Sequence, residues 1–540
     1  MTRRPPPPAD LAPLPAAQFD ASAARHLLAR AGFGGTPAQV DALAAMGLDR
    51  AVDLIVNYDG QPAKPVSPDD FDRDLIPPLT REEREQLQRA RRERDEATVE
   101  RLERKENQTK AEDRRQLQSL REWWLARMIE SARPLEEKLT LFWHGHFATG
   151  ARTIEDSWLM FQQNQLFRTH AAGNFATLVL NVIRDPAMIR YLDNDDSRRG
   201  RPNENLAREL LELFVLGEGS GYTEQDIKEG ARALTGYTLE GEDFVFRENN
   251  HDGGPKSILG RRGNWNGDDF VRIALERTEC SRFVCGKLHR FFVNDVPEQD
   301  LAPDHAAARA AAVDAMAAEL RAQQYELRPV LAKLFRSAHF FDASNRASVI
   351  KSPAQLVVQT IRQLGTPPRQ LSSLTAACEL MGQDLFQPPN VKGWDGGRSW
   401  INTSTLFVRQ NLAVYLLTGK RPGMYDWEND SARFDADALV AGAADRTDEA
   451  PANRAAAASA RPVPTGTVAP AAAQSMHASD LSPEYLVDRL LSVTLAAPAH
   501  PARRDELVRF ATQQTAPGAR AERTLSTLAL ITALPEFQLA

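Results

Sequence analysis

Two histidines that stand two residues apart, His144 and His146, are the first side chains in this sequence that are suited to bind a metal ion. They close an apolar helix pattern over residues 134–147. Side chains two positions apart point about 200° apart on an ideal helix, so both can face one ion only if Gly145 ends the helix. A metal site also needs more than two ligands. The alternative is that both imidazoles are buried and hydrogen-bonded to backbone or carboxylate groups.

A second group of polar side chains begins at Asn203, which is suited to cap a helix predicted over residues 203–216. Glu204, Arg208 and Glu212 would follow one another one turn apart on this helix, as in a solvated ladder of ion pairs. Asparagine and glutamate side chains at a helix start are equally able to present oxygen atoms to a cation. The candidate residues of this helix are Asn203, Glu204, Asn205, Arg208, Glu209 and Glu212.

Two loops add further candidates. His251 and Asp252 follow a predicted β-hairpin and have the types needed for a base and its orienting carboxylate, or for two metal ligands. The segment 387–397 holds Lys392 and Trp394 between prolines and glycines, and is suited to line a pocket. Each loop has an ordinary alternative, a simple polar turn for the first and a rigid structural loop for the second.

The elements that must position these residues are mainly helical. Apolar periodicity predicts one large helical domain over residues 19–425, with a small β-hairpin at 237–247. Residues 80–131 predict a long charged helix, or a helical hairpin, that protrudes from the body, because the apolar stripe is thin. The remaining segments are a disordered N-terminus at 1–18, a disordered linker at 430–478 and a C-terminal helical segment at 480–540 that packs on the main domain.

Composition narrows the classes of function. The 540 residues carry a formal net charge of −7, which argues against nucleic-acid binding. The chain has no run of 18 apolar residues, so no membrane span is expected. No apolar segment follows Arg3-Arg4, so the protein as written is expected in the cytoplasm, unless a different start codon hides an export sequence. The absence of Gly-x-Ser-x-Gly, P-loop and Gly-x-Gly-x-x-Gly motifs disfavours serine hydrolases, P-loop nucleotidases and Rossmann enzymes.

Several of these motifs, in the same order, resemble the bacterial domain-of-unknown-function 1800 family. The resembling segments are HLLARAGFG (26–34), FWHGHF (142–147), PNENLARELLELFVLG (202–217), YTEQDIKEGARALTGY (222–237), HDGGPKSILG (251–260), KSPAQLVV (351–358), PPNVKGWDGG (388–397) and WINTSTLFVRQN (400–411). The resemblance covers about residues 22–420 and the terminal LPEFQLA. It implies no particular reaction, although many members carry export sequences. This chain has Gly145 and Tyr237 where the family usually has Asn and Trp, and Gly145 removes one polar group near the histidines.

The leading hypothesis is a metal-dependent, hydrolase-like enzyme in which one divalent cation activates a water molecule. In this hypothesis, the metal ligands are His144, His146, Glu204 and Glu212. The catalytic residues are Glu209, His251, Asp252 and Arg208, of which Arg208 holds an anionic group. The other pocket residues are Asn203, Asn205, Lys392 and Trp394. The alternative is a non-catalytic scaffold that binds a protein partner through residues 81–121. A third hypothesis is carbohydrate or peptide binding through Trp394 and Trp400. Whether these motifs meet depends on the tertiary structure.

Overall fold

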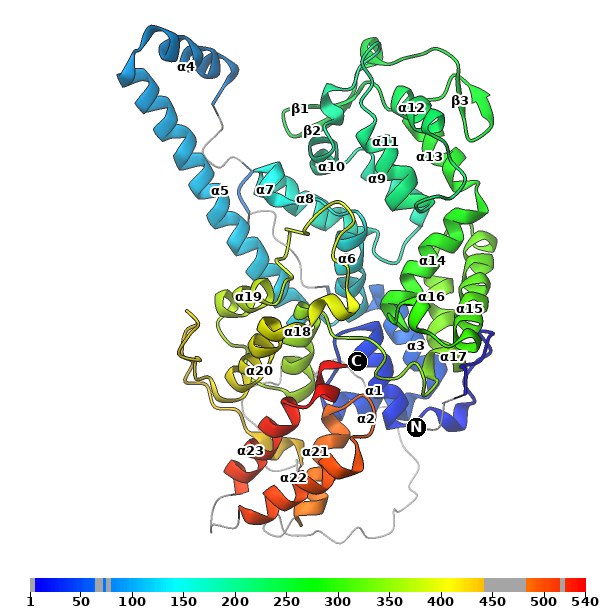
Figure 1. The fold of residues 1–540 in the computed structure, drawn as a ribbon, viewed down its shortest axis with the longest axis vertical. Helices are drawn as coiled ribbons and strands as arrows, with labels where there is room; N and C mark the ends of the chain where they lie inside the picture. Colours follow the sequence, from blue (N-terminus) through cyan, green and yellow to red (C-terminus); the bar gives the residue numbers. More distant parts are fainter. Residues whose placement is uncertain (1–4, 64–70, 74–78, 441–481, 515–519) are drawn as a thin grey trace.

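The computed structural model describes residues 5–63, 71–73, 79–440, 482–514 and 520–540 (Figure 1). The mainly α-helical prediction is confirmed, because the described residues form helices and only two small antiparallel sheets.

The helices of the first half are α1 (Ala21–Ala31), α2 (Pro37–Met46), α3 (Leu48–Val56), α4 (Arg81–Glu93), α5 (Glu96–Glu130), α6 (Pro134–His146), α7 (Ala151–Ile154), α8 (Ser157–Thr169), α9 (Phe175–Val182), α10 (Pro186–Tyr191), α11 (Asn205–Glu209) and α12 (Glu224–Ala233). The helices that follow are α13 (Gly267–Leu275), α14 (Thr278–Phe292), α15 (Pro303–Ala322), α16 (Leu327–Arg336), α17 (Ala338–Phe341), α18 (Pro353–Leu364), α19 (Leu371–Leu380), α20 (Thr403–Thr418), α21 (Pro483–Thr494), α22 (Pro501–Gln513) and α23 (Arg520–Thr532). The strands are β1 (Tyr237–Glu240), β2 (Asp243–Phe246), β3 (Lys256–Ile258) and β4 (Arg261–Gly263).

The predicted β-hairpin is present as β1 and β2, which pair in the register Tyr237 to Phe246 and Glu240 to Asp243. A second hairpin, β3 with β4, was not predicted, because each of its strands has only three residues.

Helix α6 lies at the junction of two large apolar cores (Figure 1). Leu139 and Trp143 pack into the core built around α1, α3, α9 and α14. Leu141 packs into the other core, which is built around the end of α5 with α8, α18, α20 and α21. Nearly every residue of α6 is buried, including the charged Glu137 and Lys138. The end of α6, where the two histidines stand, therefore lies deep within the molecule.

A buried ion cluster fixes α6 against its neighbours. Glu137 on α6 is fully buried and accepts hydrogen bonds from Arg127 of α5 at 2.9 Å and from Arg168 of α8 at 2.9 and 3.0 Å. Burial raises the pKa of Glu137, but the two guanidinium groups outweigh burial, and the net shift of this pKa is downward. A buried carboxylate with two hydrogen-bonded cations fixes the geometry of the three helices that supply them.

The charged segment at 80–131 is a helical hairpin, one of the two forms that its thin apolar stripe predicts. Helix α4 ends at Arg94, whose φ of 59° is left-handed, and Asp95 caps α5 by accepting a hydrogen bond from the Thr98 backbone. The hairpin protrudes from the body (Figure 1), and a small cluster of Leu79, Leu87 and Leu102 joins its two arms. The chain turns at these polar residues because local hydrogen bonds cap the two helices and few apolar contacts are lost there.

Two predictions of disorder are corrected where the structure describes the chain. Leu11 and Leu14 are buried, and the Leu14 backbone donates a hydrogen bond to Arg336, so residues 5–18 pack on the body. Leu439 and Val440 are also buried, so the predicted linker at 430–478 begins too early. The predicted segments 1–18 and 430–478 are both rich in Pro and Ala, but their few large apolar residues are sufficient to pack the described parts on the body. Residues 1–4 and 441–481 lie outside the described residues.

The last residues of the chain support the segment 349–351. The backbone of Ala540 donates to Val349 at 2.9 Å, and the Lys351 backbone donates to Gln538 at 2.9 Å. The Lys351 amine is buried and donates to the Phe537 carbonyl at 2.7 Å. Among the described residues, no helix is both long and apolar enough to cross a membrane.

Candidate functional site

The helix predicted at 203–216 changes its winding in the middle. The α-helical part, α11, ends at Glu209 and continues as a π-helical turn over Leu210–Val215. Because the π turn is at the end of the helix, its last carbonyl groups have no partner further along the helix. The carbonyl of Phe214 lies 2.9 Å from Nε2 of His146, and the carbonyl of Leu213 accepts from Nζ of Lys287 at 3.2 Å. The first and second predicted motifs therefore meet at this helix end.

His146 and Lys287 form a directed pair. A carbonyl can only accept a hydrogen bond, so His146 carries its proton on Nε2 and donates it to Phe214. Its Nδ1 is then an acceptor, and it lies 3.2 Å from Nζ of Lys287. Lys287 thus donates to two fixed acceptors, Nδ1 of His146 and the carbonyl of Leu213.

Burial controls the protonation of this pair. Burial, followed by the charge of Arg290, lowers the pKa of Lys287 to about 8. Burial, followed by the charge of Lys287, also holds the pKa of His146 well below its ordinary value. Desolvation disfavours the charged form of an amine or an imidazole. A substantial fraction of Lys287 is therefore neutral near pH 8, where an exposed lysine is almost entirely charged.

The predicted loop 387–397 packs against the same end of α6. Gly393 has a φ of +82°, and a Cβ atom at this position would lie 2.0 Å from the Gly145 carbonyl oxygen. The next residue, Trp394, places its ring 5.6 Å from the His144 ring. Only glycine at position 393 allows this approach, because any side chain would overlap the helix backbone. The first and fourth predicted motifs thus build one wall together.

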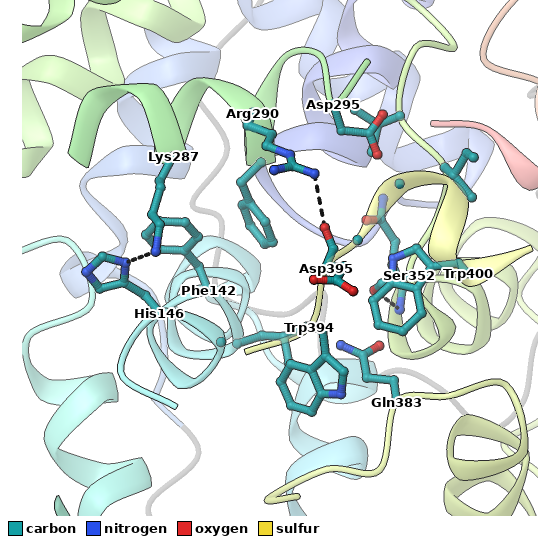
Figure 2. A pocket seen from close by; sticks show the side chains of 18 of the residues that line it. Phe142, His146, Lys287, Arg290, Asp295, Ser352, Gln383, Trp394, Asp395 and Trp400 are labelled. Atoms are coloured by element: carbon teal, nitrogen blue, oxygen red, sulfur yellow. Dashed lines mark hydrogen bonds between the residues drawn. The ribbon is translucent and has the colours of Figure 1, made fainter. Parts of the chain in front are cut away.

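These elements enclose a cleft of about 320 Å³, a volume within the range of small-molecule sites (Figure 2). Its walls come from the end of α6, from α14, from the start of α18 and from the loop that follows α19. The aromatic residues that line it are Phe142, Phe291, Trp394 and Trp400. The polar and charged residues are His146, Lys287, Arg290, Asp295, Ser352, Gln355, Gln383, Lys392 and Asp395.

The two ends of the cleft differ in charge. Figure 2 shows Lys287 and His146 at one end and Asp295 with Trp400 at the other. Arg290 lies between them and donates to the Asp395 backbone carbonyl at 3.1 Å. Burial raises the pKa of Asp295, although the charge of Arg30 opposes the shift. The cleft therefore has a basic end, at Lys287 and His146, and an acidic end, at Asp295, and aromatic walls join the two.

The rest of the predicted centre lies outside this cleft. Arg208 pairs with Glu224 at 2.8 Å and with Glu204 at 3.3 Å on the surface. Burial and the neighbouring Glu212 raise the pKa of Glu209. The predicted residues Glu204, Arg208, Glu209 and Glu212 do not line the cleft, so the solvated-face interpretation describes Glu204 and Arg208.

The predicted asparagines have structural contacts. The side chain of Asn203 donates to the Asp193 carbonyl at 2.9 Å and accepts from the Asn205 backbone at 2.9 Å. Helix α11 begins at Asn205, two residues later than predicted, with Glu204 at the N-cap position.

His251 and Asp252 belong to another contact network. Nδ1 of His251 donates to the Thr235 carbonyl at 2.9 Å. Asp252 pairs with Arg232 at 2.8 Å, and this hydrogen bond lowers the pKa of Asp252 to about 2. Both residues thus anchor the loop before β3 to helix α12.

The two histidines do not share a ligand position. Helix α6 continues through His146, so Gly145 does not end it as predicted. The His144 ring contacts Trp124, Phe386 and Trp394, whereas the His146 ring faces other aromatic residues. Burial lowers the pKa of His144 to about 3. In the described part of the chain, no group of three or more His, Cys, Asp or Glu side chains is placed to hold a metal ion.

Of the predicted site residues, His146, Lys392 and Trp394 line the cleft. Sequence reasoning missed Lys287 and Arg290, which stand one turn apart on the amphipathic helix α14. Such a spacing is common on solvated helix faces, so the residues themselves gave no sign of a site. It also missed Asp295 and Gln383, which only the packing of distant segments brings to the cleft.

The fold and the cleft define a class, a mainly helical protein with one buried helix end that opens into a mixed-charge, aromatic-lined pocket. The chain belongs to the family described as "Protein of unknown function (DUF1800)", whose pattern matches residues 26–539. No curated protein and no solved structure matches the chain significantly.

Proposed function

We propose that the protein is an enzyme that acts on a small organic acid, and that the cleft beside α6 and α14 is its active site. The observation that carries the proposal is the position of Lys287, whose side chain lines the cleft while two fixed acceptors hold its amine. Amines with a lowered pKa in pockets are frequent catalytic groups, because they are neutral and basic near physiological pH.

The lining residues favour an acidic substrate with a flat or apolar part. Arg290 and Lys392 place two cations around the cavity, beside the partly neutral Lys287 and against Asp295 and Asp395. Lys392 is largely exposed, and its ion pair with Glu218, at 3.7 Å, lies at the surface. Phe142, Phe291, Trp394 and Trp400 offer flat apolar surfaces. Pockets of this composition bind planar or apolar groups and orient them by a few charges.

Hydrolysis, the reaction expected from the sequence, is compatible with this site. A neutral amine at Lys287 can take a proton from a water molecule that attacks the substrate. His146 keeps the amine in place and is a positioning residue in this scheme. The sequence hypothesis assigned the same step to a metal-bound water, but three of its predicted ligands have different partners. His144 lies beside Trp394, His146 contacts Phe214 and Lys287, and Glu204 pairs with Arg208 at the surface.

A binding experiment tests the site itself. We would measure binding of a library of small organic acids to the full chain and to Arg290→Met and Lys287→Met. Saturable binding that Arg290→Met weakens at least about tenfold supports the site, since one charge-assisted contact is worth that much. Lys228→Met, which removes an exposed lysine of α12, is the matched control. Ligands that bind all four proteins equally would place the site elsewhere.

A second candidate function, a partner-binding scaffold, is favoured by the protruding hairpin of α4 and α5 (Figure 1). The hairpin leaves the body beyond Asp113, which accepts a hydrogen bond from the Ser157 backbone. Lys105 and Glu83 lie side by side at 2.8 Å, so a short Gly-Ser linker between them would remove the tip and keep the base. Capture of the same partners by the shortened protein would count against a binding role for the tip.

A further inference from the structure

We propose that Lys287 is a nucleophile that forms an imine with the carbonyl carbon of an organic acid bound in the cleft. This inference rests on the proposed function and adds the substrate class, a carbonyl compound that also carries an acidic group.

The two hydrogen bonds of Nζ use the hydrogens of a neutral amine. A neutral lysine has two N–H groups and one lone pair. Nδ1 of His146 and the carbonyl of Leu213, each 3.2 Å away, both require a donor and therefore use the two N–H groups. Among the described residues, the lone pair takes no part in these hydrogen bonds. Because the Lys287 side chain lines the cleft, we infer that this lone pair is available to an electrophile there.

The surroundings favour the neutral, reactive form of the amine, because burial and the charge of Arg290 lower its pKa. Arg290 is one turn further along α14, and the Phe283 ring lies 4.9 Å from Nζ. An apolar surrounding together with a neighbouring cation is a known way to activate a lysine for imine formation. No ion pair of the described residues joins a carboxylate to Lys287, so its ammonium form lacks a counter-ion and keeps only the two acceptors and the Phe283 ring.

The step balances without a further reactant. The lone pair of Nζ forms the C–N bond, and the π electrons of the carbonyl move to its oxygen, which takes one N–H proton by way of Nδ1 of His146. The second N–H proton leaves with that hydroxyl group as water, and a C=N bond remains. The products are the imine and one water molecule. Arg290 and Lys392 would hold the acidic group of the substrate meanwhile.

A second buried lysine, Lys351, can show whether labelling requires access to the cleft or only a neutral amine. Burial lowers the pKa of Lys351 to about 7, so its amine is also largely neutral at pH 8. However, Lys351 donates to the Phe537 carbonyl and does not line the cleft. A reagent that labels any neutral amine would label both lysines if both were reached, whereas a cleft-directed carbonyl compound reaches Lys287 alone.

The test uses pyridoxal 5′-phosphate, a flat aldehyde with an acidic group, and sodium cyanoborohydride to reduce any imine to a stable amine. At pH 8 we expect peptide mass spectrometry to find the reduced adduct on Lys287 at least about tenfold faster than on Lys228, because far more of Lys287 is neutral there. Lys351 should stay unlabelled. Lys287→Arg, which keeps the positive charge, should lose this adduct and no other.

Pyridoxine 5′-phosphate, which has an alcohol in place of the aldehyde, separates the two proposals. If it binds in the cleft with an affinity that Arg290→Met weakens, but the aldehyde leaves Lys287 unreduced, the imine is overturned and the binding site stands. If it does not bind, and Lys287 is labelled no faster than Lys228, the imine is overturned as well. Labelling of Lys287 that excess pyridoxine 5′-phosphate suppresses would support both.

Discussion

Gly393 lies against the backbone of Gly145 so closely that the two segments which carry the cleft, loop 387–397 and the end of α6, have no room for a side chain between them. This contact places Trp394 over His144 and brings Lys392 to the mouth of the cleft. The site thus depends on a contact between two backbones that are some 250 residues apart in the sequence.

Gly393→Ala should therefore disturb the cleft as well as the stability. The new Cβ would meet the Gly145 oxygen at 2.0 Å, and the left-handed backbone adds its own strain. Gly200→Ala is the matched control, because its φ of +83° is nearly the same and nothing lies within 4 Å of its Cβ. We expect a loss of about 1 kcal/mol for Gly200→Ala and a clearly larger loss for Gly393→Ala in chemical denaturation. Equal losses of stability in the two variants would mean that loop 387–397 moves away from Gly145 at no cost in free energy.

The reactivity of Lys287 should depend on pH with a midpoint near its lowered pKa of about 8. An amine reacts when it is neutral, so its rate of modification rises as the pH passes through this pKa and is constant above it. An ordinary exposed lysine continues to gain reactivity up to about pH 10.4. Rates of acylation followed residue by residue would measure the curve of Lys287. A midpoint near that of an ordinary lysine would contradict the effect of burial.

Glu137→Gln should be strongly destabilising. The substitution leaves Arg127 and Arg168 buried without their carboxylate, a change that typically costs about 3–5 kcal/mol. The lowered pKa of Glu137 also means that its contribution is complete at neutral pH and is lost as the pH falls below the ordinary glutamate range. Unfolding by denaturant at two pH values would measure both effects. Glu224→Gln removes an exposed ion pair with Arg208 and should change stability very little.

Elemental analysis of the purified protein tests the metal hypothesis. Because the predicted ligands lie in separate networks, we expect less than about a tenth of an equivalent of any divalent metal. Near-stoichiometric metal that disappears in a folded His144→Ala, Glu209→Ala double variant would restore the metal-dependent hydrolase hypothesis. It would also show that side chains rearrange when the ion binds.

The sequence by itself determined the helical class, the β1–β2 hairpin, many helix caps and the segments that matter. Thr223, for example, caps α12 together with Asp226, because the two partners are three residues apart. Local periodicity and local hydrogen bonds decide such features. The sequence also singled out FWHGHF for its two histidines, and the loop around Trp394 for its prolines and glycines.

Only the tertiary structure decided which of these motifs meet. His146 was chosen as a metal ligand, but its partner is Lys287, 141 residues away on a helix with no unusual pattern. Arg208 was expected in the centre, but Glu224 holds it at the surface. The sequence names each side chain but does not show whether it lies in a cleft, in a core or on a solvated face. Its chemistry depends on burial and on the atoms around it, and long-range packing sets both.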